Sequence, residues 1–398
     1  ENMDANIGGT VADDDAIIYT IASNQVNAIR FMAASRTLII GTAGGEFTVS
    51  GGGDNDAVTP TNILIKKQSN HGAANIDAVA VANATLFVQR AKRKLRELAY
   101  NFDVDGYIAP DLTILAEHVT DGGIVEMAYQ EEPLAIIWCV RDDGELVALT
   151  YQREQEVVAW HRHKFGGTFG SGASATGFGV CESVAVIPTE DSEYELYMII
   201  KRTINGATKR YVEYLNTFDF DESDNTSFNF LDSQLSYSGS AATTISGLSH
   251  LEGQSVSILA DGATHPNKTV SSGSITLDRS ATKVKVGLGY TSLLKTMRID
   301  AGAQNGTSQA KTKRIYEVTA RLYESVGVEI GPDLSNMERV PFRTSSDPMD
   351  QGIPPFTGDK EVEFRGNYDT DGFMIVRQTQ PLPLTILSLY PRLVTNDG

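Results

Sequence analysis

Residues 136–149 read IIWCVRDDGELVAL and contain the pattern that decides the fold. An apolar stretch at 136–140 is followed by the turn Asp142-Asp143-Gly144 and by a second apolar stretch that begins after Glu145. An Asp-Gly pair supplies the positive-φ positions that a tight hairpin requires. The segment therefore predicts two antiparallel strands joined by a short turn.

The same pattern recurs along the first 235 residues. Each copy has a short alternating strand, an apolar strand and, after a polar or glycine-containing turn, a second alternating strand. The first strands are expected at 29–33, 78–82, 124–128 and 183–187, the second at 38–41, 86–89, 136–139 and 196–199, and the third at 46–49, 94–98, 145–149 and 210–214. A further strand-like stretch at 156–160 suggests four strands in each unit.

Units of this kind, spaced roughly 45–60 residues apart, match the period of β-propeller blades. One small meander cannot bury its apolar face alone, so neighbouring meanders must cover each other. The alternative is a long β-sandwich in which the spacing is coincidental. We predict an all-β protein with a partial or complete β-propeller, an inserted small β-barrel or sandwich module, and a C-terminal β-region.

The expected division has three parts. Residues 1–235 form the propeller-like repeat domain, with a glycine-rich surface loop inserted at 166–179. Residues 236–295 form the inserted module, which is rich in serine, threonine and glycine, with strands expected at 255–259, 274–277 and 283–286. Residues 296–398 form the C-terminal region that returns to the main body, with late strands near 373–376 and 384–389.

One strand of the C-terminal region shows strict alternation. Tyr316, Val318, Ala320 and Leu322 alternate with polar residues, which predicts a half-buried strand with these four side chains inside.

Composition excludes several classes of function. The 33 lysines and arginines are outnumbered by 51 aspartates and glutamates, which gives a net charge of −18. Such a chain is a poor candidate for a protein whose whole surface binds nucleic acid or for a basic membrane-surface protein. Two cysteines, Cys139 and Cys181, cannot form a disulfide scaffold. The first residue is Glu1, so we expect the chain to be part of a longer or processed polypeptide.

Several segments, taken in order, resemble one family. They are 38–46 (LIIGTAGGE), 59–62 (TPTN), 106–113 (GYIAPDLT), 151–163 (YQREQEVVAWHRH), 201–206 (KRTING), 247–253 (GLSHLEG) and 380–384 (QPLPL). Together they resemble the tail tubular protein B, or tail nozzle protein, of short-tailed bacteriophages. The resemblance covers nearly the whole chain, and because members of the family are usually longer, it implies a missing N-terminal portion.

The resemblance implies a structural virion protein and not an enzyme. It implies a homo-hexameric ring in the virion tail, assembled in the host bacterial cytoplasm and bound to the tail adaptor protein. Such rings form the distal tube through which DNA passes as cargo, and some carry a docking surface for tail fibres. We hypothesise that acidic side chains face this channel, because an acidic wall repels phosphate; a strongly positive wall would rule this out.

Four residues form the signature strand of the resemblance: Trp160, His161, Arg162 and His163. His161 and His163 are two apart, so on a strand they face the same side, where two imidazoles could form half of a zinc site. No CxxC or carboxylate–histidine pattern nearby supplies the other half. The favoured alternative is a polar strand end packed by Arg162 and Trp160.

Two turns match the first half of a calcium loop. They are Asn101-Phe102-Asp103-Val104-Asp105-Gly106 and Asn367-Tyr368-Asp369-Thr370-Asp371-Gly372. The twelfth position, where a glutamate is expected, holds Leu112 or Gln378. Simple Asp-Gly turns are therefore the favoured interpretation, and calcium binding stays open.

One basic cluster stands out from the acidic background. Its cations are Arg90, Lys92, Arg93, Lys94 and Arg96, and we treat them as a candidate interface. A subunit interface and a solvated hairpin turn explain the cluster equally well, whereas a DNA contact explains it less well.

No catalytic motif is present. The sequence holds no nucleophile elbow, no Walker loop and no zincin spacing, so we expect neither a catalytic residue nor a cofactor or metal. The alternative function is a carbohydrate-binding or glycan-cleaving β-propeller that serves as a receptor-binding virion part. Its enzymatic form needs two convergent carboxylates, a feature that sequence alone does not reveal.

Overall fold

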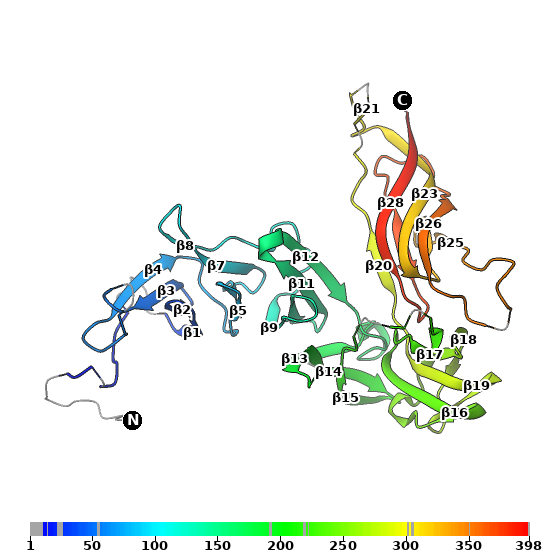
Figure 1. Cartoon of the computed structure of the whole chain (residues 1–398), viewed down its shortest axis with the longest axis horizontal. Helices are drawn as coiled ribbons and strands as arrows, with labels where there is room; N and C mark the ends of the chain where they lie inside the picture. The colour runs from blue at the N-terminus through cyan, green and yellow to red at the C-terminus, as the bar shows by residue number, and fades with distance from the viewer. Residues whose placement is uncertain are drawn as a thin grey trace. The chain divides into compact units, whose positions relative to one another are not determined.

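The computed structural model describes residues 11–396, apart from 14, 22–26, 54–55, 191–192, 218–219, 222, 301, 304–305 and 350. The protein is all-β, as the sequence predicts. The helices among the described residues are 3₁₀ turns of three residues each, and all other regular elements are strands (Figure 1). Among the described residues, no helix is long and apolar enough to cross a membrane.

Consecutive antiparallel meanders make up the first half of the chain. The sheets are β1 (Ile29–Ala34), β2 (Leu38–Thr42), β3 (Gly45–Ser50) and β4 (Leu64–Ser69); β5 (Val79–Val81), β6 (Ala84–Val88), β7 (Leu95–Asn101) and β8 (Gly106–Ile108); β9 (Ile124–Gln130), β10 (Ile136–Arg141), β11 (Leu146–Gln152) and β12 (Val157–His163); and β13 (Val180–Pro188), β14 (Tyr194–Ile204) and β15 (Ala207–Tyr214). We call them sheets one to four. Each strand predicted for the repeat overlaps a strand of the structure, and sheets one to three have four strands.

The sheets cover one another's apolar faces, as the repeat argument requires. Leu86, Leu95 and Val88 of sheet two share a buried cluster with Ile137 and Val147 of sheet three. The opposite face of sheet two places Phe87 and Leu98 against Phe31 and Ile39 of sheet one. Sheet two therefore contributes to two cores, because the side chains of a strand alternate between its faces.

The hairpin between β10 and β11 forms as its Asp-Gly pair predicts. Gly144 has φ +80°, and a Cβ there would meet Val180 at 2.3 Å. Asn205 and Gly206 likewise take φ +48° and +73° at the turn from β14 to β15. Both turns therefore use residues that tolerate the left-handed region.

The chain folds into two compact units. The first comprises residues 1–163, 180–200 and 211–215, and the second comprises 164–179, 201–210 and 216–398. The boundary passes through β14 and β15. The three-part division expected from the sequence stays a prediction.

The second unit contains the glycine-rich segment at 164–179, and hydrogen bonds hold this segment in place. The guanidinium of Arg202, which is fully buried, donates to the carbonyl of Gly166 at 2.7 Å. The backbone N–H of Gly170 donates to Thr203 Oγ1 at 2.9 Å, and Lys201 Nζ lies 4.3 Å from the centre of the Phe169 ring.

A four-stranded sheet with its own core follows in the second unit. Its strands are β16 (Asp232–Ser246), β17 (Ser255–Ala260), β18 (Ala263–Thr269) and β19 (Ser274–Leu288), in the order β16-β19-β17-β18. The two strands predicted at 274–277 and 283–286 are halves of β19, so that prediction is wrong in one detail. The exposed residues Asp278, Arg279 and Ser280 resemble a turn in sequence, but the strand continues through them beside an irregular stretch of β16.

Two sheets enclose the last core. One has the order β20-β27-β24-β25 and the other β26-β23-β28. Their strands are β20 (Ser292–Lys295), β23 (Thr312–Ser325), β24 (Glu329–Asp333), β25 (Asn336–Arg339), β26 (Phe356–Glu363), β27 (Ile375–Gln378) and β28 (Thr385–Asn396). A short pair, β21 (Gly302–Ala303) and β22 (Gly306–Thr307), lies between β20 and β23 in the chain.

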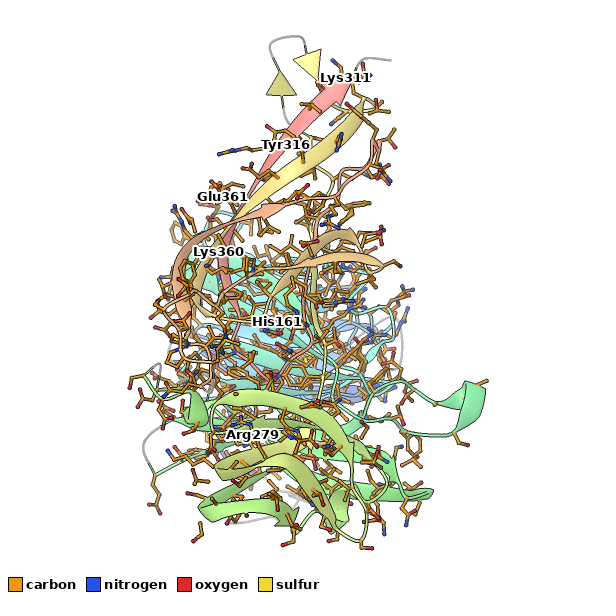
Figure 2. All side chains as sticks on the ribbon, turned by 90° about the vertical axis from the view of Figure 1, so that its right-hand side faces the viewer. His161, Arg279, Lys311, Tyr316, Lys360 and Glu361 are labelled. Atoms are coloured by element: carbon orange, nitrogen blue, oxygen red, sulfur yellow. The ribbon has the colours of Figure 1, made fainter. Side chains whose placement is uncertain are left out.

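The alternation predicted for β23 holds for Val318, Ala320 and Leu322, which are buried. It fails at Tyr316, which is 43% exposed, whereas Ile315 is buried. The pairing with β28 shifts register between Ile315 and Glu317, so a bulge moves the apolar side of the strand by one residue. Figure 2 labels Tyr316 on β23, together with Lys360 and Glu361 on β26.

Candidate functional site

The two histidines of the signature strand meet on one face of sheet three. His161 Nδ1 and His163 Nε2 are 2.7 Å apart, and His161 Nε2 lies 3.1 Å from Thr150 Oγ1 (His161 is labelled in Figure 2). The spacing of two residues on β12 places both imidazoles on the same side, as predicted.

Trp138 lies on the same face and packs against both imidazoles. The centre of its ring is 5.0 Å from that of His163 and 6.4 Å from that of His161. Its indole N–H donates to Gln130 Oε1 at 2.9 Å, and Gln130 Nε2 donates to the carbonyl of Tyr194 at 2.6 Å. We call Gln130, Trp138, Thr150, His161 and His163 the histidine cluster.

The expected packing of the histidines by Trp160 and Arg162 is wrong. Alternation along β12 turns these two side chains to the other face of sheet three. There, Trp160 packs against the core shared with sheet two and donates to the carbonyl of Leu112 at 2.9 Å. Arg162 donates to the carbonyl of His118.

Burial keeps the histidine cluster neutral. Burial lowers the pKa of His161, and burial together with the neighbouring His161 lowers the pKa of His163 to about 3. A pair of neutral imidazoles could ligate a metal, but such a site needs more ligands. Among the described residues, no three histidine, cysteine, aspartate or glutamate side chains are grouped to hold an ion. What the contacts do show is a hydrogen bond between the two imidazoles and their packing against Trp138.

The basic residues around the β6–β7 turn differ in how they are paired. Arg93 forms an ion pair with Asp121, and Lys94 Nζ lies 2.8 Å from Asp111 and 3.3 Å from Glu117. The hydrogen bonds to Asp111 and Glu117 raise the pKa of the Lys94 ammonium.

Arg90 and Lys92 form no ion pair with a carboxylate among the described contacts, and Arg96 interacts electrostatically with Glu46 but mainly contacts neutral oxygens. Arg96 donates to Gln89 Oε1 at 2.8 Å and to the carbonyl of Ala109 at 2.6 Å. Arg90 reaches only the carbonyl of Ala43, at 3.4 Å. Arg90 and Lys92 are exposed, so the positive charge available to a partner is concentrated on these two residues.

The two calcium-like turns use their polar side chains locally. In the β7–β8 turn, Asn101 Oδ1 accepts the backbone N–H of Asp103 at 2.9 Å, and Asp105 Oδ1 accepts the Tyr100 hydroxyl at 2.6 Å. In the later turn, Asp371 pairs with Arg298 at 3.0 Å. These contacts favour the interpretation as plain turns.

The buried carboxylates of the first unit also have structural partners. Glu97 lies 2.7 Å from Arg153, Glu145 lies 2.9 Å from Arg141, and Glu46 accepts the Ser69 hydroxyl. Burial raises the pKa of Glu46, although hydrogen bonds from Ser69, His71 and Gly72 oppose this effect.

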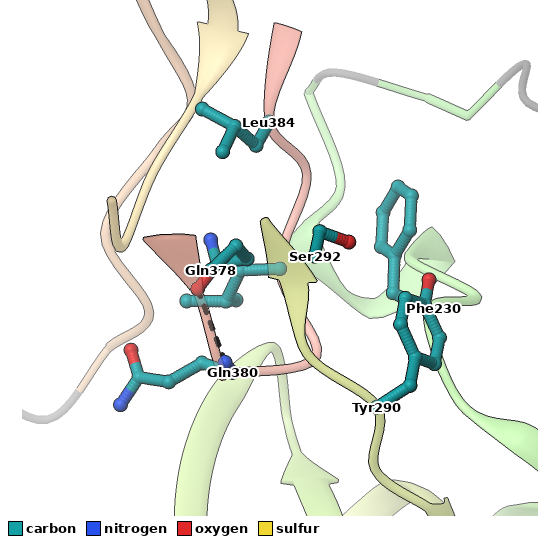
Figure 3. Close-up of a pocket in the computed structure, with 7 residues that line it drawn as sticks. Phe230, Tyr290, Ser292, Gln378, Gln380 and Leu384 are labelled. Atoms are coloured by element: carbon teal, nitrogen blue, oxygen red, sulfur yellow. Dashed lines mark hydrogen bonds between the residues drawn. The ribbon is translucent and has the colours of Figure 1, made fainter. Parts of the chain in front are cut away.

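A small cavity lies in the second unit (Figure 3). Its volume is about 100 Å³, and it is lined by Phe230, Tyr290, Ser292, Gln378, Gln380, Leu382 and Leu384. The backbone N–H of Gln380 donates to Gln378 Oε1 at 3.1 Å, and Gln378 Nε2 donates to the carbonyl of Val326 at 2.7 Å. Ligand sites usually measure about 300–1,000 Å³, so this cavity is too small for a sugar chain.

Sequence reasoning missed Gln130, Trp138 and Thr150. They lie on three neighbouring strands, and only the register of β9, β10, β11 and β12 brings them to the histidines. Trp138 appeared only as part of an apolar run. The one available signal was that a tryptophan inside a strand needs a partner for its N–H.

Comparison with known proteins gives no family. No family model matches the chain, and no curated protein matches it. Among solved structures, it is similar to a variant of an exo-β-1,3-galactanase from Phanerochaete chrysosporium solved with β-1,3-galactotriose. That likeness covers 96% of this chain and 99% of the galactanase chain, with 9% identity and a TM-score of 0.22.

Proposed function

We propose that this chain is a structural subunit of a phage tail tube, or nozzle, and that it acts by assembling into a ring around a channel through which DNA passes. The observation that carries this proposal is the way in which consecutive meanders share cores. Sheet two has one apolar face against sheet one and the other against sheet three. Close-packed interiors deform little, so shared cores of this kind suit a scaffold that holds its loops in fixed positions.

The described polar groups fit an architectural role. The buried carboxylates Glu97 and Glu145 pair with arginines, and the histidine cluster packs within sheet three. In this proposal the tail adaptor is a partner and DNA is a passive cargo. The net charge of −18 suits a channel wall that does not hold phosphate.

Electron microscopy of the full-length protein with its adaptor partner tests the proposal. We expect ring-shaped particles of uniform stoichiometry. A parallel assay with bacterial polysaccharide as substrate should show no turnover. Turnover that one carboxylate substitution abolishes, in a protein that forms no rings, would instead establish the glycan-cleaving alternative.

A further inference from the structure

The two ends of sheet two carry exposed apolar side chains with opposite charges beside them. At one end, the β7–β8 turn presents Phe102 and Val104 alternating with Asp103 and Asp105; we call residues 102–105 the acidic tip. At the other end, Arg90 and Lys92 accompany Ile114 and Leu115; we call these four residues the basic end.

The acidic tip is held in a defined conformation but exposes its apolar groups. Phe102 is 87% exposed and Val104 is 63% exposed. The hydrogen bonds of Asn101 and Tyr100 fix the backbone and the carboxylate of Asp105. Phe102 and Val104 thus form an exposed apolar pair between two carboxylates, a surface that suits a partner with apolar and basic groups.

The basic end has the same combination of order and exposure. Leu115 is 93% exposed and Ile114 is 69% exposed. The backbone beside them is fixed, because the N–H of Leu112 donates to the carbonyl of Leu95 at 3.0 Å and the Thr120 hydroxyl donates to the carbonyl of Arg93 at 2.7 Å. Arg90 and Lys92 supply positive charge that no carboxylate neutralises among the described contacts.

Strand β7 separates the two surfaces. It runs from Leu95, next to the basic end, to Asn101, next to the acidic tip. Seven residues at about 3.3 Å each place the surfaces roughly 20 Å apart. One chain therefore cannot bring its own two surfaces together, but two copies can.

We propose that the acidic tip of one copy docks on the basic end of the next copy. Phe102 and Val104 pack against Ile114 and Leu115, while Asp103 and Asp105 meet Arg90 and Lys92. Because the two surfaces differ, the contact is heterologous and generates a ring when the rotation between copies closes. The proposal names the subunit contact within the proposed nozzle and rests on that function only for ring closure.

Charge reversal tests the contact in the full chain. One variant carries Asp103→Lys with Asp105→Lys, a second carries Arg90→Glu with Lys92→Glu, and a third carries all four changes. Sedimentation velocity over a range of concentrations should show self-association weakened at least about tenfold in the first two variants, because like charges meet. The variant that carries all four changes should regain self-association. A one-to-one mixture of the first two variants should regain it as well.

A matched control reverses two exposed carboxylates on β26, Glu361→Lys with Glu363→Lys, and should self-associate like the unmodified chain. The proposal is overturned if the unmodified chain stays monomeric or if reversal at one end leaves self-association unchanged. It is also overturned if neither the variant with all four changes nor the mixture regains self-association. Rings that ignore the reversals would contradict this contact and leave the nozzle function intact. Self-association that depends on the charges but never yields uniform rings would support this contact and contradict the nozzle function.

Discussion

Burial couples the charge state of His163 to folding. Its pKa is about 3 in the folded protein, mainly because of burial, whereas the pKa of a histidine in an unfolded chain is about 6.5. Between these two values the unfolded chain binds the extra proton. The free energy of unfolding should therefore fall as the pH drops from about 6.5 towards 3, by at most about 1.4 kcal/mol per pH unit for each such proton.

Substitution of His163 separates this effect from general acid unfolding. We expect His163→Gln to flatten the dependence of stability on pH between 6.5 and 3, whatever it does to stability at pH 7. Denaturant unfolding at several pH values measures that slope. His118→Gln, which changes an exposed histidine of the same unit, is the control. Equal slopes in the original chain and the His163 variant would refute the assignment.

At the scale of elements, one ion pair joins sheets two and three. Glu97 of β7 is 7% exposed and lies 2.7 Å from Arg153, which follows β11. Arg153 also donates to Asn83 Oδ1, beside β6, at 2.6 Å. The guanidinium therefore links the two sheets beside Tyr151, which belongs to their shared core.

Arg153→Met should remove this link and leave Glu97 buried without its charged partner. We expect a loss of about 1.5–3 kcal/mol in the free energy of unfolding, the range for hydrogen bonds to charged groups. Chemical denaturation followed by tryptophan fluorescence measures it. Arg36→Met, at an exposed arginine of the same unit, should cost far less. A loss no larger than that control would show that the pair contributes nothing.

The elements themselves could be predicted where local chemistry defines them. The Asp-Gly turn at Gly144 and the existence of strand β11 needed no knowledge of distant residues, but β11 is buried on both faces and does not alternate as expected. The bulge at Tyr316 and the continuous course of β19 could not be predicted, because both depend on pairing with β28 and β16. The histidine cluster was half predictable: the period of a strand puts His161 and His163 together, but Trp138 reaches them only through the register of three strands.

At the scale of the whole molecule, the natural reporters all lie in the first unit. Both tryptophans, Trp138 and Trp160, and both cysteines, Cys139 and Cys181, belong to it. Burial raises the pKa of both thiols, that of Cys181 to about 12, so neither reacts readily while the unit is folded.

Tryptophan fluorescence and thiol labelling should therefore follow unfolding of the first unit alone, whereas far-ultraviolet circular dichroism follows both units. If the units unfold separately, the optical transitions will not coincide, and thiol labelling will coincide with the fluorescence change. Coincidence of all three signals at every denaturant concentration would mean that the two units unfold as one.

The double role of sheet two also bears on synthesis at the ribosome. When residue 108 has emerged, this sheet is complete and can cover sheet one, but the apolar surface formed by Leu86, Val88 and Leu95 stays exposed until Ile137 and Val147 have been translated. A nascent chain stalled in that interval should be captured by chaperones more strongly than one stalled after residue 163, when sheet three covers this surface.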